Sequence, residues 1–89
     1  MAITFSDLVD YEVVKSAPYV VRYYDEETGF YTTLFDNDEQ SIAEVEGESW
    51  YSEAEVFEIY VEDPNVYDPS LASAHDPRVV IELDCDYFL

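Results

Sequence analysis

"PYVVRYYDEETGFYTTLF", residues 18–35, places two runs of β-branched and aromatic residues on either side of a polar segment. Such runs are typical of strands, and the polar segment between them has turn-forming residues with Gly29 at its end. The stretch therefore predicts a β-hairpin in which residues 19–24 pair with residues 30–35.

The segment before this hairpin favours a short helix. Apolar residues recur from Phe5 to Val13 at near-helical spacing, and Thr4 and Asp7 fit a capping box. Pro18 would end the segment. Two adjacent valines in the same segment leave a strand as the alternative.

Two further strands are predicted after the hairpin. The stretch EVFEIYVED, residues 55–63, alternates so that one side of a strand carries Phe57, Ile59 and Val61 and the other carries Glu58, Tyr60 and Glu62. Ser52 and Glu55 also spell a capping box, so a helix is the alternative there. The last strand is predicted in RVVIELDCDYF, residues 78–88. Residues 64–77 hold three of the four prolines and predict a connection with one helical turn at 70–74.

The stretch DNDEQSIAEVEGE, residues 36–48, fits two structures. Asp36 could cap a helix in which Ile42 and Val45 face inward. Glutamates at every second position from residue 44 fit a strand instead, and Gly47 favours a turn or bulge close by. The whole pattern predicts one α+β domain over residues 1–89, a small mostly antiparallel sheet of four or five strands with one or two short helices.

Charge is the most unusual property of the chain. Its 89 residues include 22 Asp and Glu but three Lys and Arg, which gives a formal net charge of −19. Small soluble designs carry a net charge of roughly 2–8, so this excess goes beyond what solubility requires and must repel itself. Hydrophobic residues make up 48% of the chain and aromatic residues 17%, which excludes acidic disorder and allows a core.

Catalytic and metal-binding patterns are weak. The one histidine, His75, lies in the proline-bounded connection near Asp68 and Asp76, and no activated nucleophile or glycine-rich phosphate loop accompanies it. Residues 36–41 begin like an EF-hand loop but lack its later glycine and glutamate. The DCD sequence at 84–86 falls on a predicted strand, without loop geometry. We therefore expect neither an enzyme nor a metal or cofactor site.

The expected compartment is the cytoplasm. Cys85 is the single cysteine, so the chain forms no internal disulfide, and this favours a reducing environment. No apolar run approaches the roughly 20 residues of a membrane helix, and the first residues have no basic region typical of a signal peptide.

Nucleic acid is the physical template for a folded polyanion. Duplex DNA carries one negative charge per roughly 1.7 Å of axis, so about 30 Å, the expected diameter of this domain, carries roughly 18 phosphates. Alternate residues of a strand lie about 6.6–7 Å apart, similar to consecutive phosphates of one DNA strand. Glu44, Glu46 and Glu48 would present carboxylates at that interval if their segment were extended.

In size, charge and aromatic content the chain resembles DNA-mimic proteins as a functional class. These include anti-restriction proteins, some anti-CRISPR proteins and uracil-glycosylase inhibitors, many of them made by phages. The resemblance implies an inhibitor that occupies the cationic DNA- or RNA-binding groove of a host defence or nucleic-acid-processing protein. It implies a basic protein partner, no direct nucleic-acid binding, no membrane, a monomer or small homo-oligomer, and action in the host cytoplasm if the chain is phage-encoded.

The predicted partner-binding surface is the acidic stretch 36–63, which has eleven carboxylates and no Lys or Arg. The aromatic pair in this stretch, Trp50 and Tyr51, would anchor the interface, since aromatic residues are enriched at the energetic centres of interfaces. Trp50 fits a core position equally well. The candidate residues are Asp36, Asp38, Glu39, Glu44, Glu46, Glu48, Trp50, Tyr51, Glu53, Glu55, Glu58, Glu62 and Asp63.

Two other functions share the same electrostatics. An immunity protein or antitoxin would bind a cationic nuclease through the same charge steering. A generic acidic domain from an extreme halophile would use its carboxylates for hydration in concentrated salt.

Overall fold

The computed structural model describes residues 3–9, 18–62 and 78–89. Its elements are α1 (Phe5–Leu8), β1 (Tyr19–Asp25), β2 (Phe30–Asp36), the 3₁₀ helix η1 (Ile42–Glu44), α3 (Ser49–Glu53), β3 (Val56–Glu62), β4 (Arg78–Leu83) and the 3₁₀ helix η3 (Cys85–Phe88). The helical turn predicted at 70–74, His75 and Asp63 lie outside the described residues. None of the helices in the described ranges is long and apolar enough to cross a membrane.

The predicted hairpin is confirmed. β1 and β2 pair antiparallel, with Tyr24 opposite Tyr31 and Asp25 opposite Phe30. The turn is closed by a hydrogen bond of 2.9 Å from the Gly29 N–H to the Asp25 carbonyl. Gly29 has a φ of 76°, which lies in the left-handed region that a residue without a Cβ adopts at little cost.

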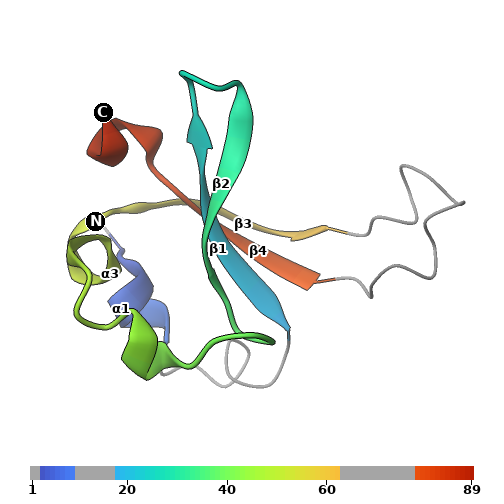
Figure 1. Cartoon of the computed structure of the whole chain (residues 1–89), viewed down its shortest axis with the longest axis vertical. Helices are drawn as coiled ribbons and strands as arrows, with labels where there is room; N and C mark the ends of the chain where they lie inside the picture. Colours follow the sequence, from blue (N-terminus) through green and yellow to red (C-terminus); the bar gives the residue numbers. More distant parts are fainter. Residues whose placement is uncertain (1–2, 10–17, 63–77) are drawn as a thin grey trace, which may run out of the picture.

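One four-stranded mixed sheet, in the order β2-β1-β4-β3, forms the centre of the fold (Figure 1). β3 and β4 pair antiparallel, whereas β1 and β4 pair parallel. Two of the three pairings are therefore antiparallel, and the predicted α+β class with two short helices is confirmed. The last strand of the sequence lies inside the sheet, between β1 and β3.

The main hydrophobic cluster lies on one face of the sheet and is built around Phe5 of α1, whose side chain is completely buried. Its ring centroid lies 5.9 Å from that of Tyr19, 6.0 Å from those of Phe35 and Trp50, and 5.5 Å from that of Tyr51. Such pairs add stabilisation beyond the burial of their area. The α1 prediction is confirmed, and α1 and α3 lie side by side in Figure 1.

The capping box predicted at the start of this helix is supported by a direct contact. The backbone N–H of Thr4 donates a hydrogen bond of 2.9 Å to the carboxylate of Asp7. Because Asp7 lies in the first turn, its negative charge also interacts favourably with the helix dipole. The helix is one turn long and ends at Leu8, and Val13, the last residue of the predicted spacing, lies outside the described residues.

The extended reading of residues 44–48 is wrong. Ile42–Glu44 is a 3₁₀ helix, and the chain then turns, with hydrogen bonds from the Glu46 N–H to the Ile42 carbonyl and from the Glu48 N–H to the Val45 carbonyl. Val45 is buried, as the helical reading required, but the residue that caps this helix is Ser41 and not Asp36, which ends β2. The glutamates of this segment therefore do not form a strand with phosphate-like spacing.

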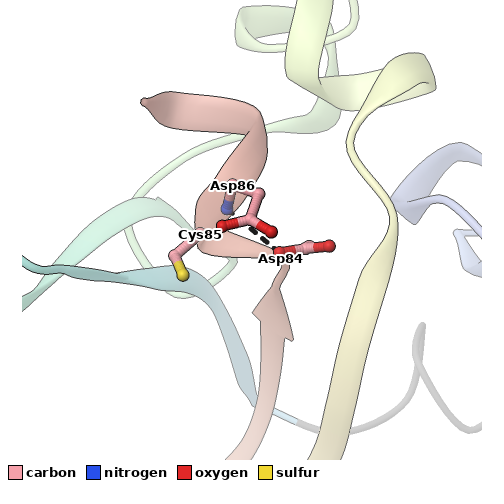
Figure 2. A group of neighbouring side chains, drawn as sticks. All are labelled: Asp84, Cys85 and Asp86. Atoms are coloured by element: carbon pink, nitrogen blue, oxygen red, sulfur yellow. Dashed lines mark hydrogen bonds between the residues drawn. The ribbon is translucent and has the colours of Figure 1, made fainter.

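The final strand is shorter than predicted. β4 ends at Leu83, and residues 85–88 form η3 (Figure 2). The carboxylate of Asp84 accepts a hydrogen bond of 3.0 Å from the Asp86 N–H, which caps η3. The assignment of residues 84–86 to a strand was therefore wrong, because a short polar side chain at that position satisfies the first turn of a helix.

β3 is a strand, as predicted, but its alternation is interrupted. Val56 pairs with Leu83 and Glu58 pairs with Glu82, so Phe57 is the extra residue of a β-bulge. The bulge places the side chain of Phe57 on the opposite face of the sheet from the one that strict alternation predicts.

Ile59 and Val61 stay on the core side of the sheet, opposite Ile81 and Val79. They are 51% and 68% exposed, because this edge of the sheet is not covered by α1 or α3. The phenylalanine instead borders the same pockets as Tyr31 and Glu82. The prediction that all three apolar residues share a face is therefore wrong for Phe57.

Candidate functional site

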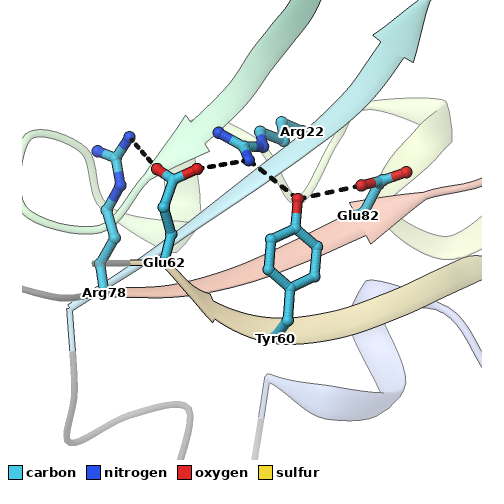
Figure 3. A network of polar contacts seen from close by, with 5 residues as sticks. All are labelled: Arg22, Tyr60, Glu62, Arg78 and Glu82. Carbon is cyan, nitrogen blue, oxygen red and sulfur yellow. Dashed lines mark hydrogen bonds and ion pairs between the residues drawn. The ribbon is translucent and has the colours of Figure 1, made fainter. Parts of the chain in front are cut away.

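The sheet face opposite the helices carries a network of charged and phenolic side chains, and we call it the polar face (Figure 3). The Arg22 guanidinium on β1 donates hydrogen bonds of 2.9 Å to the Tyr60 hydroxyl and to the Glu62 carboxylate. Tyr60 in turn donates to Glu82 at 3.1 Å. Arg78 of β4 lies 3.5 Å from the second oxygen of Glu62.

Strand register creates this network. Arg22 lies opposite Glu82 in the parallel pair, and Glu62 lies opposite Arg78 in the antiparallel pair. Side chains directly opposite one another on one face are close enough to interact. Arg22 and Glu82 are both buried, at 9% and 8% exposure, so their charges require these partners.

The network shifts the titration of its members. Burial opposes the ionisation of Glu62, but the hydrogen bond and charge of Arg22, together with Arg78, hold the pKa of Glu62 below its usual value. Burial raises the pKa of Tyr60 despite its hydrogen bond to Arg22. Glu62 is thus an ionised anchor for both guanidinium groups.

Arg22 and Arg78, the two basic residues of the described ranges, therefore both pair with the carboxylate of Glu62. Within residues 3–9, 18–62 and 78–89, both ion pairs end on Glu62. The other carboxylates of these ranges have no Lys or Arg partner there. Most of the predicted binding residues are exposed, namely Asp38, Glu39, Glu44, Glu46, Glu48, Glu53, Glu55 and Glu58.

Four other predicted binding residues have different surroundings. Trp50 is 7% exposed and belongs to the core, so its predicted role as an interface anchor is wrong. Tyr51 and Asp36 are half-buried, and Glu62 is held inside the network. The exposed acidic residues are spread over the β2–α3 connection, the end of α3, the residue before β3 and the polar side of β3, and so come from several elements.

Asp84, Cys85 and Asp86 form the group of potential metal ligands in the described residues, with ligand atoms within 4.8 Å of one another (Figure 2). The Asp84 carboxylate is already engaged by the Asp86 N–H. Burial, with the charges of Glu26, Asp86 and Asp84, raises the pKa of the Cys85 thiol and so disfavours the thiolate that binds metals. This chemistry does not favour a metal centre.

The polar face also carries exposed aromatic residues that the sequence pattern did not identify. Tyr24 and Tyr31 pack edge to face with centroids 5.5 Å apart, and Phe57 borders the same pocket. Their exposed fractions are 39%, 47% and 68%. The signal for this cluster is the cross-strand Tyr24–Tyr31 pair of the hairpin, but the contribution of Phe57 depends on the bulge.

No protein-family model, no curated protein and no solved structure matches the chain. The function therefore has to be argued from its own residues.

Stability is expected to rise with salt. Screening reduces repulsion between exposed charges, with a Debye length of about 10 Å at 0.1 M. Each kcal/mol of repulsion relieved would raise the Tm by roughly 4–8 °C in a domain of this size. Melting curves between 10 and 500 mM NaCl test this. A flat or falling Tm would contradict a crowded anionic surface, and folding only above molar salt would favour the halophilic alternative.

Proposed function

We propose that this chain is a polyanionic mimic of nucleic acid that inhibits a basic nucleic-acid-binding protein by occupying its cationic groove. One observation carries the proposal. Within the described ranges both guanidinium groups are held by Glu62, so the exposed carboxylates of these ranges have no Lys or Arg partner there. Ordinary protein surfaces intersperse both signs, and their counter-charges come from within the same molecule.

Size and charge support the same function. The molecule measures 38 Å along its longest axis. The same length of duplex carries roughly 22 phosphate charges at one per 1.7 Å. A net charge of −19 on this body is close to that density. The fold can therefore compete electrostatically for a groove that accepts nucleic acid.

The polar face is the part of the surface that we propose meets the target. It combines Glu58 and the partly buried network with the exposed rings of Tyr24, Tyr31 and Phe57. Aromatic residues are enriched at the energetic centres of interfaces, whereas scattered carboxylates mainly steer association. The inhibitor would act in the cytoplasm, that of the host if the chain is phage-encoded.

Competition with nucleic acid tests the proposal. The immobilised protein is incubated with a bacterial lysate at low salt, and bound proteins are challenged with duplex DNA, with structured RNA or with salt. We expect the bound proteins to be nucleic-acid-binding proteins that duplex DNA or RNA releases. Polyglutamate beads of equal charge are the control for nonspecific capture. Targets that nucleic acid fails to release would contradict the mimic, and a nuclease as the sole target would favour the immunity-protein alternative.

Two sets of charge-reversal substitutions, matched in net charge, test which part of the surface binds the target. Replacing Glu26, Glu58 and Asp86 with lysine changes the border of the polar face. Replacing Glu39, Glu46 and Glu48 changes the β2–α3 connection by the same net charge, and all six residues are exposed. Glu44 is kept because its carboxylate accepts a hydrogen bond of 2.6 Å from the Ser41 N–H.

The first triple is expected to abolish capture of the target, and the second to slow association. This is because global steering falls equally in both variants, whereas only the first places cations beside the aromatic rings. Surface plasmon resonance on the captured target measures both rates, and circular dichroism confirms that each variant is folded. Equal losses would mean that net charge alone matters, which would contradict a specific binding surface.

A further inference from the structure

A small pocket opens on the polar face where β4 ends and η3 begins, and all four strands contribute residues to its lining. It has a volume of about 240 Å³. This is smaller than the roughly 300–1,000 Å³ of typical small-molecule sites, so its size suits the head of one side chain. Its lining residues are Tyr24, Tyr31, Phe57, Glu82, Leu83, Asp84 and Cys85.

The lining of the pocket is mainly aromatic and anionic. Three rings border it together with two carboxylates, those of Glu82 and Asp84, and Leu83 and Cys85 make up the rest. Glu82 is only 8% exposed; it accepts one hydrogen bond of 3.1 Å from the Tyr60 hydroxyl but makes no ion pair within the described residues. A buried carboxylate without a cation is costly, so a cation that entered the pocket would be stabilised by it.

One guanidinium group, that of Arg22, already lies beside the pocket. The Arg22 guanidinium carbon lies 4.3 Å from the centroid of the Tyr31 ring, which is a cation–π distance. Its positive charge is offset by the ion pair of 2.9 Å with Glu62. Glu58, Glu82 and Asp84 add negative charge around the pocket, so the local field still favours a cation.

We propose that this pocket receives the guanidinium group of an arginine supplied by the basic partner. The flat guanidinium stacks on aromatic rings and donates paired hydrogen bonds to carboxylates, whereas an ammonium group is a point charge that does neither as well. Phe57 and Tyr24 supply the rings for stacking, and Glu82 and the Asp84 oxygen that is not bonded to the Asp86 N–H accept the hydrogen bonds. This inference rests on the proposed function for the source of the arginine, but guanidinium binding can be tested without the partner.

Nuclear magnetic resonance with N-acetyl-arginine amide tests the pocket itself. The amide is titrated into the full chain, and the aromatic and backbone signals are followed, with N-acetyl-lysine amide as the matched cation. We expect saturable shifts centred on Tyr24, Tyr31 and Phe57, at least several-fold tighter for arginine than for lysine. Shifts spread over all exposed carboxylates, or equal affinity for the two amides, would overturn the proposal.

Two exposed phenylalanines provide a matched pair of variants. Phe57 is 68% exposed and borders the pocket, whereas Phe30 is 74% exposed and does not. Phe57→Ala is expected to weaken arginine amide binding about two- to fivefold, the scale of a cation–π contact at an exposed site, and Phe30→Ala to leave it unchanged. Tyr24→Ala is the second pocket variant. Equal affinity of the Phe57 and Phe30 variants for the amide would overturn the proposal that the pocket binds arginine.

The captured target separates this inference from the proposed function. If nucleic acid releases the target, Phe57→Ala should weaken target binding by at least the same factor, and Phe30→Ala should not. Target binding that survives Phe57→Ala would overturn the arginine anchor and leave the mimic intact. If no nucleic-acid-binding target is captured but arginine amide still occupies the pocket, the mimic fails and the pocket stands.

Discussion

Replacing Phe5 with alanine is expected to lower the free energy of unfolding by about 3–5 kcal/mol. Phe5 is fully buried, and its ring contacts those of Tyr19, Phe35, Trp50 and Tyr51. Alanine would remove the ring that joins α1 and α3 to the sheet and leave a cavity among aromatic residues. Small domains have a total stability of about 5–15 kcal/mol, so this variant would be partly unfolded at 37 °C.

Urea unfolding, followed by tryptophan fluorescence and circular dichroism, measures this loss. Phe30→Ala is the matched control, since Phe30 is 74% exposed and its loss should change stability by less than about 0.5 kcal/mol. An equal urea midpoint for the Phe5→Ala and Phe30→Ala variants would contradict the core described above.

Replacing Arg22 with methionine is expected to cost about 3 kcal/mol, the lower end of the effect of removing one partner of a buried ion pair, because this pair is part-buried. The side chains of Arg22 and Glu62 are 11% and 23% exposed, so solvent replaces their contact poorly. Methionine fills similar space but leaves Glu62 with Arg78 alone and Tyr60 with one hydrogen bond fewer. The charges of Glu62 and Glu82 would then lie close together without Arg22 between them.

The double variant Arg22→Met with Glu62→Gln is the control, because it removes both charges of the pair. It should recover much of the stability lost in the single variant. Similar urea midpoints for the single and double variants would contradict the role of the ion pair.

Acid dependence is a second measurement of the same pair. The folded pKa of Glu62 is lowered from 4.5, so its contribution to stability is present above that pH and is lost as pH falls through the folded value. In Arg22→Met the pKa of Glu62 should move toward its ordinary value, and the loss of stability below about pH 4.5 should become shallower. If the urea midpoint falls with decreasing pH equally steeply in the wild-type protein and in Arg22→Met, this expectation is contradicted.

Local signals in the sequence predicted the hairpin and α1 because the structures they specify are local. Gly29 fixes the turn, and Thr4 with Asp7 caps the helix. The parallel pairing of β1 with β4 joins residues about sixty positions apart, and no pattern within either strand specifies such a partner. The two strands were predicted, but their order in the sheet was not.

The candidate site was predicted less completely than the fold. Alternating glutamates at 44–48 fit an exposed strand and an exposed turn equally, since solvent imposes no periodicity on either. Phe57 changed sides because one bulged residue shifts the alternation. Trp50 was open to both a core and an interface role, and packing against Phe5 decided it. The ion pairs on Glu62 depend on the β3–β4 register, which the sequence does not state.

The position of β4 between β1 and β3 has a consequence for synthesis of the chain. The ribosome makes the hairpin first and can release it early, but β1 and β3 have no common neighbour in the sheet until β4 inserts between them. Sheet completion must therefore follow translation of residues 78–83, and its long-range contacts slow folding relative to a simple meander. Until then both partners of β4 keep unpaired edges, and like-charge repulsion between nascent chains would protect those edges from pairing with one another.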